Sequence, residues 1–90
     1  MKIQTRDGLL ETKVLKHVMI NNRKVSIHRW INYYNEFDDD YFTASDYATG
    51  LQIPRCKSET IQGTILNAEY TLNQYQAVNY DYSKHEVINT

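Results

Sequence analysis

The sequence predicts an α+β fold, in which a small antiparallel sheet of three to five strands is packed on one face by a single α-helix near residues 58–76. Two observations carry this prediction. Up to Pro54, the apolar and aromatic side chains form short runs separated by turn residues, which is typical of strands. Beyond Pro54, apolar side chains recur at spacings of three and four, which is the period of a helix. A chain of 90 residues makes one domain, 1–90.

The segment 11–34 predicts a β-hairpin. Two apolar runs flank the turn-forming residues 21–24, and within each run the apolar side chains fall two or four apart. The apolar positions are Val14, Val18 and Ile20 in the first run and Val25, Ile27 and Ile31 in the second. The opposite face of the second strand carries Ser26, His28 and Trp30.

Three shorter elements are expected next. Residues 35–40 predict a polar, acidic loop, and residues 41–45 have the aromatic and β-branched composition of a strand. Residues 46–50 predict a turn in which Gly50 takes a positive φ. Residues 51–53 predict a short returning strand, which Pro54 ends because it has no backbone N–H.

The helix is predicted from one apolar stripe, formed by Ile61, Ile65, Ala68, Leu72 and Tyr75. Ser58 is the expected N-cap, with Glu59 in the first turn where it complements the helix dipole. Gly63 is expected to permit close packing against the sheet, at a cost of about 1 kcal/mol relative to alanine. Residues 77–90 predict a short extra strand, a docked extension or a flexible tail.

A single helix leaves the second face of the sheet without a cover. We therefore expect that face, with His28 and Trp30 on it, to be solvated, to form a homodimer or to dock a partner.

The composition predicts a cytoplasmic protein. No apolar run approaches the roughly 20 residues that span a bilayer, so no membrane association is expected. The first residues show no apolar secretion signal, and a single cysteine fits a reducing compartment.

Catalytic and metal-binding motifs are not apparent in the sequence. The histidines and Cys56 lack the spacing of a zinc site, so no metal and no cofactor are expected. Arg55 and Lys57 flank Cys56, and their charges could lower the pKa of its thiol. No motif surrounds this cysteine, however, so we predict that the protein is not an enzyme.

The charge is divided unevenly along the chain. Residues 1–30 hold seven basic and two acidic side chains, a net charge of +5, whereas residues 31–90 hold three basic and nine acidic ones, a net charge of −6. Around residues 33–42 five aromatic residues surround four acidic ones, and such a surface can imitate a nucleic acid and occupy a basic groove on another protein. The predicted partner-binding residues are Tyr33, Tyr34, Glu36, Phe37, Asp38, Asp39, Asp40 and Tyr41.

The basic N-terminal half supports an alternative, a small regulator that binds nucleic acid. Its cations could follow a phosphate backbone while Trp30 and Tyr33 stack on bases. The candidate residues are Lys13, Lys16, Arg23, Lys24 and Arg29. The pI near 6.3 makes direct nucleic-acid binding the weaker of the two hypotheses.

Residues 42–53, FTASDYATGLQI, followed by residues 57–61, KSETI, resemble small proteins of phages and prophages in low-GC Gram-positive bacteria. Such proteins include the type II anti-CRISPR inhibitors, which bind and block a host enzyme. The resemblance covers roughly residues 25–75. It implies a non-enzymatic inhibitor or adaptor whose partner is a host protein, such as the CRISPR nuclease Cas9.

Overall fold

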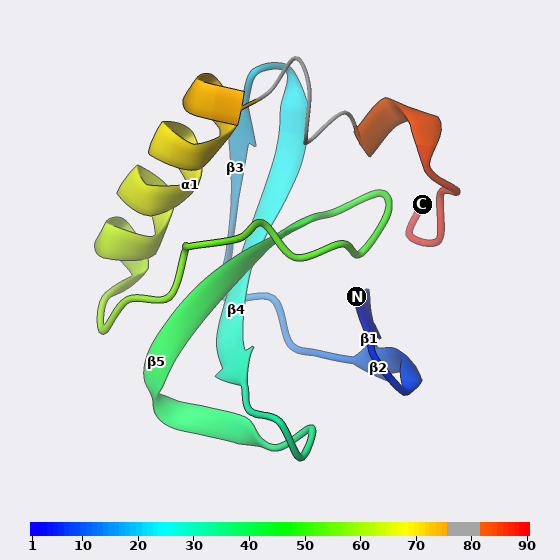
Figure 1. The fold of residues 1–90 in the computed structure, drawn as a ribbon, viewed down its shortest axis with the longest axis vertical. Helices are drawn as coiled ribbons and strands as arrows, with labels where there is room; N and C mark the ends of the chain where they lie inside the picture. Colours follow the sequence, from blue (N-terminus) through cyan, green and yellow to red (C-terminus); the bar gives the residue numbers. More distant parts are fainter. Residues whose placement is uncertain (76–81) are drawn as a thin grey trace.

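The computed structural model describes residues 1–75 and 82–90 and confirms the α+β class (Figure 1). A two-stranded antiparallel sheet has the order β1-β2, and a three-stranded antiparallel sheet has the order β3-β4-β5. The elements in chain order are β1 (Lys2–Thr5), β2 (Gly8–Glu11), β3 (Lys16–Ile20), β4 (Arg23–Ile31), β5 (Phe37–Asp46), α1 (Ile61–Tyr75) and a short 3₁₀ helix (Tyr82–Lys84).

The hairpin expected within residues 11–34 is β3-β4. Asn21 and Asn22 both have positive φ, at 51° and 64°, which is the backbone of the tight turn that matches the twist of paired strands. The turn fixes the register, so that Ile20 pairs with Arg23 and Lys16 with Ile27. Val25 and Ile27 therefore lie on one face of the sheet, as the sequence predicted.

The prediction of a loop at residues 35–40 is wrong for residues 37–40, because these residues belong to β5. Phe37 pairs with Ile31, and a register shift between Arg29 and Ile31 lets the strand bend. The side-chain oxygen of Asp38 accepts the N–H of Asp40 at 2.7 Å, and this local bond stabilises the bend. Acidic composition suggested a loop, but Asp39 and Asp40 are exposed and Asp38 is half-buried within a strand.

Residues 51–53 do not form the expected strand. Instead, the whole segment 51–58 runs irregularly along β5 and has two isolated bridges to it, Ser45 with Gln52 and Phe42 with Ser58. The pairing is interrupted because Pro54 has no N–H and Arg55 takes a φ of 64°. The backbone of Gly50 has the positive φ that was predicted, at 70°.

The helix α1 begins three residues later than expected. The N-cap is Thr60, whose hydroxyl accepts the N–H of Gly63 at 2.9 Å. Ser58 accepts the N–H of Thr60 instead, and Glu59 precedes the helix. A Cβ at Gly63 would meet the Ser58 and Thr60 hydroxyls, so this glycine makes room for the cap and not for the sheet.

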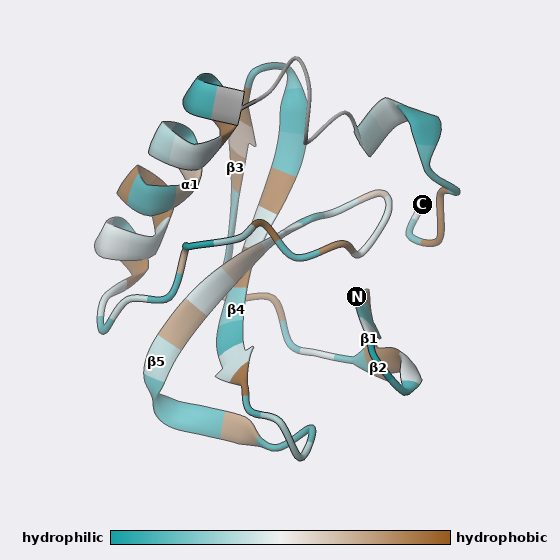
Figure 2. Ribbon diagram, viewed as in Figure 1, coloured by the Kyte–Doolittle hydropathy of each residue, from teal (hydrophilic) through white to brown (hydrophobic). Residues whose placement is uncertain are grey.

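The core lies between α1 and one face of the β3-β4-β5 sheet. Hydrophobic and hydrophilic residues are interleaved along β4 and β5, as Figure 2 shows, and the hydrophobic ones face the helix. The buried core residues are Ile20, Val25, Ile27, Ala44, Ile53, Cys56, Ile65, Ala68, Leu72 and Tyr82. The structure does not describe the side chain of Tyr75 or residues 76–81. The predicted place of Tyr75 on the apolar stripe therefore stays a prediction.

The second face of the sheet is covered over Ser26 and His28, which corrects the expectation of an open face there, whereas Trp30 at the end of β4 is only half-buried. Ser26 and His28 are fully buried. The β1-β2 hairpin, which was not expected, and the residues after Tyr82 lie on this side, opposite α1 (Figure 1), whereas Tyr82 itself belongs to the core. Gln4 N–H donates to Gly50 O, and Ile88 N–H donates to Ala48 O, so both ends of the described chain dock on the 47–50 turn.

Ile88 and Asn89 hold the C-terminal residues to the turn through their bonds to Ala48 O, whereas residues 77–81 fall outside the described part. None of the helices described here is long and apolar enough to cross a membrane.

Candidate functional site

The turn between β4 and β5 projects two tyrosines into solvent. The side-chain oxygen of Asn32 accepts the backbone N–H groups of Tyr34 at 2.8 Å and Glu36 at 3.0 Å, and Asn35 takes a φ of 61°. This local network fixes the turn without using the rings. Tyr33 and Tyr34 are consequently 67% and 77% exposed, with their rings edge to face at 5.5 Å.

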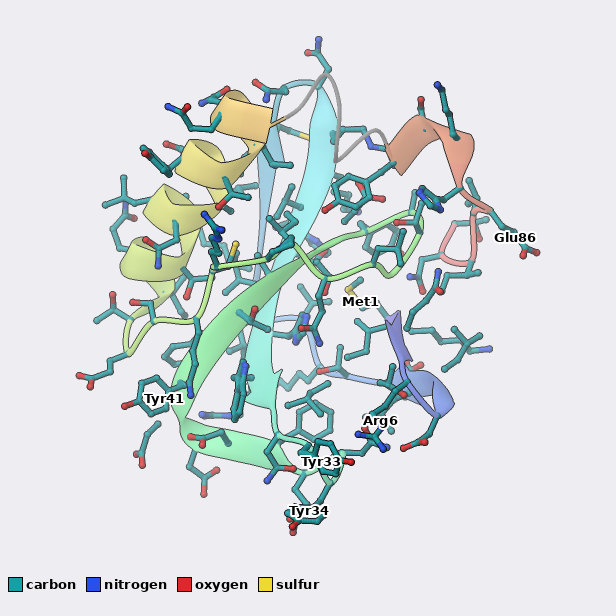
Figure 3. All side chains as sticks on the ribbon, viewed as in Figure 1. Met1, Arg6, Tyr33, Tyr34, Tyr41 and Glu86 are labelled. Atoms are coloured by element: carbon teal, nitrogen blue, oxygen red, sulfur yellow. The ribbon has the colours of Figure 1, made fainter. Side chains whose placement is uncertain are left out.

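The β1-β2 turn braces the tyrosine turn from one side. The Arg6 guanidinium lies 3.9 Å from the centre of the Tyr33 ring, and Asn35 donates to the Asp7 carboxylate at 2.9 Å. Figure 3 shows Arg6 beside Tyr33 at this junction. A hollow of about 500 Å³ lies between the two turns and is lined by Gln4, Thr5, Arg6, Ile31, Asn32, Tyr33, Asn35, Leu51 and Gln52.

The beginning of β5 carries the acidic residues. Glu36, Asp39 and Asp40 are exposed, whereas Asp38 is half-buried because it bonds the bend of the strand. Over residues 1–75 and 82–90, no ion pair engages any of these four carboxylates. Phe37 is 40% exposed and adds a third ring close to the acids in the chain.

Tyr41 lies apart from the tyrosine turn. Figure 3 places Tyr41 at one side of the molecule and Tyr33 and Tyr34 at its lower end. Tyr41 belongs instead to a group with Trp30 and Lys57, in which the Lys57 ammonium lies 3.8 Å from the Trp30 ring centre and 4.4 Å from that of Tyr41. The predicted binding surface therefore has two parts, which the acidic residues 38–40 join along the chain.

The alternative basic site is largely occupied by contacts within the protein. Arg23 makes a two-pronged ion pair with the buried Asp46 carboxylate, at 2.9 and 2.7 Å. Arg29 donates to Asp39 O, and Lys24 lies 4.1 Å from the centre of the Tyr47 ring. Lys13 and Lys16 are exposed. The cations of β4 thus bind to neighbouring elements of the fold.

A histidine and a serine form a buried pair on the covered face of the sheet. His28 Nε2 lies 2.8 Å from Ser45 Oγ, and both side chains are fully buried. Burial lowers the pKa of His28, an effect that its bond to Arg29 O opposes. The pair resembles the base and nucleophile of a hydrolase in distance alone, because no substrate can reach Ser45 in this fold.

Cys56 does not have the reactive thiol that its basic neighbours suggested. The side chain is 1% exposed, and burial raises the pKa of its thiol to about 12. The Sγ atom contacts Pro54 O at 3.4 Å. The Lys57 ammonium contacts the two rings described above.

Within the described ranges, no three histidine, cysteine, aspartate or glutamate side chains come together as a metal ion would require. Sequence reasoning missed Arg6 and the ring contact of Lys57. Asp7-Gly8, a dipeptide common in hairpin turns, could have indicated the β1-β2 hairpin, whereas the irregular path of residues 51–58 carries no such signal.

Comparison with known proteins leaves the assignment to the structure itself. No protein-family model matches the chain, and neither a curated protein nor a solved structure shows a significant match.

Proposed function

We propose that this protein is a non-enzymatic inhibitor or adaptor, of phage or mobile-element origin, that binds a host protein in the bacterial cytoplasm. The observation that carries the proposal is the exposure of Tyr33, Tyr34 and Phe37 next to carboxylates that have no cationic partner in the described chain. We call this surface, residues 33–41, the acidic-aromatic surface.

Three properties of the surface suit protein recognition. Its rings offer large contact areas that lose little conformational entropy on binding. Its carboxylates are solvated at present, so they can steer a basic partner toward the rings. The turn that holds the tyrosines is fixed by Asn32 and braced by Arg6, so little ordering is required on binding.

The expected partner is a protein with a basic, nucleic-acid-binding groove. Carboxylates and aromatic rings that lie close together on one surface can take the places of phosphates and bases in such a groove. The resemblance to anti-CRISPR inhibitors makes a CRISPR nuclease the first partner to test.

The test is affinity capture from a Gram-positive lysate, with and without added CRISPR nuclease, using the wild type and the double variant Asp39→Asn/Asp40→Asn. Both side chains are exposed, so the change removes charge without touching the Asp38 bond that stabilises β5. The matched control is Glu69→Gln/Glu86→Gln, which removes the same charge from exposed positions elsewhere. Figure 3 shows that Glu86 lies at the far side of the molecule from Tyr41.

We expect one protein to be captured by the wild type and the control, and to be lost from the Asp39→Asn/Asp40→Asn sample. Equal capture by all three forms, or capture of nucleic acid alone, would contradict the proposal and favour the basic residues of β3 and β4.

A further inference from the structure

Trp30 and Tyr41 form a clamp for a cation, and the chain's own Lys57 occupies it. The Lys57 ammonium lies 3.8 Å from the Trp30 ring centre and 4.4 Å from that of Tyr41, so one cation contacts two rings at once. The rings come from neighbouring strands, Trp30 from β4 and Tyr41 from β5, next to the paired residues Arg29 and Phe42. The clamp is therefore built on the sheet.

Lys57 is held less firmly than the rings are. It lies in the irregular segment 51–58, its side chain is exposed, and it has no ion pair in the described part of the chain. Its four-carbon stem can turn the ammonium out into water without moving the backbone. A contact of this exposed kind changes an equilibrium by only about two- to five-fold, so a second cation can replace it.

The residues around the clamp favour the binding of a positively charged group. Asp39 and Asp40, directly before Tyr41, are exposed, and their carboxylates make no ion pair among the described residues, although the Arg29 guanidinium donates to Asp39 O. Elsewhere the chain also places a cation on an aromatic ring, as Arg6 lies on Tyr33. A guanidinium suits the clamp best, because its flat face stacks on a ring while its edges donate to carboxylates.

We infer that the Trp30–Tyr41 clamp receives an arginine or lysine side chain of the partner protein, and that Lys57 is an internal substitute which this side chain displaces. The inference rests on the proposed function and deepens it. It assigns one cationic side chain of the partner to a specific binding site, the Trp30–Tyr41 clamp beside the acidic residues.

The experiment uses a hexaarginine peptide as the probe and the indole N–H signal of Trp30 in NMR spectra as the readout. Trp30 is the single tryptophan of the chain, so the signal reports this site alone. Lys57→Gln removes the competing cation, and Lys2→Gln is the control because it removes the same charge from an exposed position in β1.

We expect Lys57→Gln to bind the peptide about two- to five-fold more tightly than the wild type and Lys2→Gln do. This factor is the strength of one exposed cation–π contact, which the peptide no longer has to displace. In the Lys57→Gln background, Tyr41→Leu should abolish the shift of the indole signal. Tyr41→Phe keeps the ring face and should preserve the shift, which separates loss of the clamp from a general loss of folding.

The inference would be overturned if Lys57→Gln and Lys2→Gln bound the peptide with the same affinity. It would also be overturned if Tyr41→Leu left the peptide-induced shift of the indole signal unchanged. Failure here is distinguishable from failure of the proposed function. The partner could still depend on Asp39 and Asp40 in the capture experiment while the clamp shows no preference for the peptide.

Discussion

His28 shows how a single buried side chain makes this fold sensitive to pH. Its Nδ1 lies 2.9 Å from Arg29 O and its Nε2 lies 2.8 Å from Ser45 Oγ. A carbonyl oxygen only accepts, so Nδ1 carries the proton and Nε2 accepts from the Ser45 hydroxyl. A second proton would have to displace that hydroxyl bond in a site closed to water, which is why burial lowers the pKa of His28.

The stability of the protein should therefore fall in mild acid. The unfolded chain takes up a proton near the ordinary histidine pKa of 6.5, whereas folded His28 resists it to a lower pH. The stabilisation that His28 contributes is complete above the unfolded pKa of 6.5 and is lost as the pH falls toward the lower pKa of folded His28. Urea unfolding between about pH 7.5 and pH 5 should show the decline.

His28→Asn should lower the free energy of unfolding by about 1–3 kcal/mol at neutral pH, because Ser45 loses its acceptor, and should flatten the decline in acid. His85→Asn, at an exposed position, is the control and should keep the wild-type profile. A profile of His28→Asn parallel to that of the wild type would assign the pH dependence to other groups.

For single residues, the sequence could predict exposure where contacts within a few residues of the chain determine it. The exposure of Tyr33 and Tyr34 follows from a turn that Asn32 and Asn35 set within five residues. The ring contacts of Lys57 could not be predicted, because they depend on a chain path that Arg55 sets with its left-handed backbone.

Among the elements, those with strong periodicity were predictable and those held by long-range contacts were not. The helix and the β3-β4 hairpin follow from apolar spacing and an asparagine turn. The β1-β2 hairpin has little apolar alternation, and distant contacts hold it, among them the backbone bond from Gln4 to Gly50 and the bond from Asn35 to Asp7. The acidic start of β5 has the composition of a loop, whereas its strand conformation depends on the pairing of Phe37 with Ile31.

Gly50 is the point where these long-range contacts converge. Its φ is 70°, and a Cβ there would lie 2.6 Å from Lys2 O and 2.8 Å from Ile88 Cδ1. Gly50→Ala should therefore lower the free energy of unfolding by about 3 kcal/mol or more, since the backbone is strained and the β1 backbone and the Ile88 side chain must both move. Thermal unfolding is the measurement.

Gly8→Ala is the matched control for that prediction. Gly8 also has a positive φ, at 115°, but a Cβ there would meet nothing within 4 Å. It should cost only the backbone strain, about 1–2 kcal/mol. Equal losses from the two variants would mean that Gly50 does not join β1 to the C-terminal segment.

Across the whole molecule, folding mixes the charges that the sequence keeps apart. The basic strand β4 pairs with the acidic strand β5, so Arg23 meets Asp46 and Arg29 meets the backbone of Asp39. The excess negative charge remains at the bend of β5, beside the exposed rings. The uneven charge of the sequence thus becomes a local acidic-aromatic surface, which is why that surface is our candidate for partner binding.

The most direct test of this account is site-specific photo-crosslinking with benzoylphenylalanine at Tyr34 and, separately, at Tyr70. The two tyrosines are comparably exposed, at 77% and 66%, but Tyr34 lies on the acidic-aromatic surface and Tyr70 lies on α1. In host lysate containing a CRISPR nuclease, we expect a crosslinked protein partner from position 34 and none from position 70. A partner crosslinked from position 70 alone would place the interface on the helix and contradict the central claim.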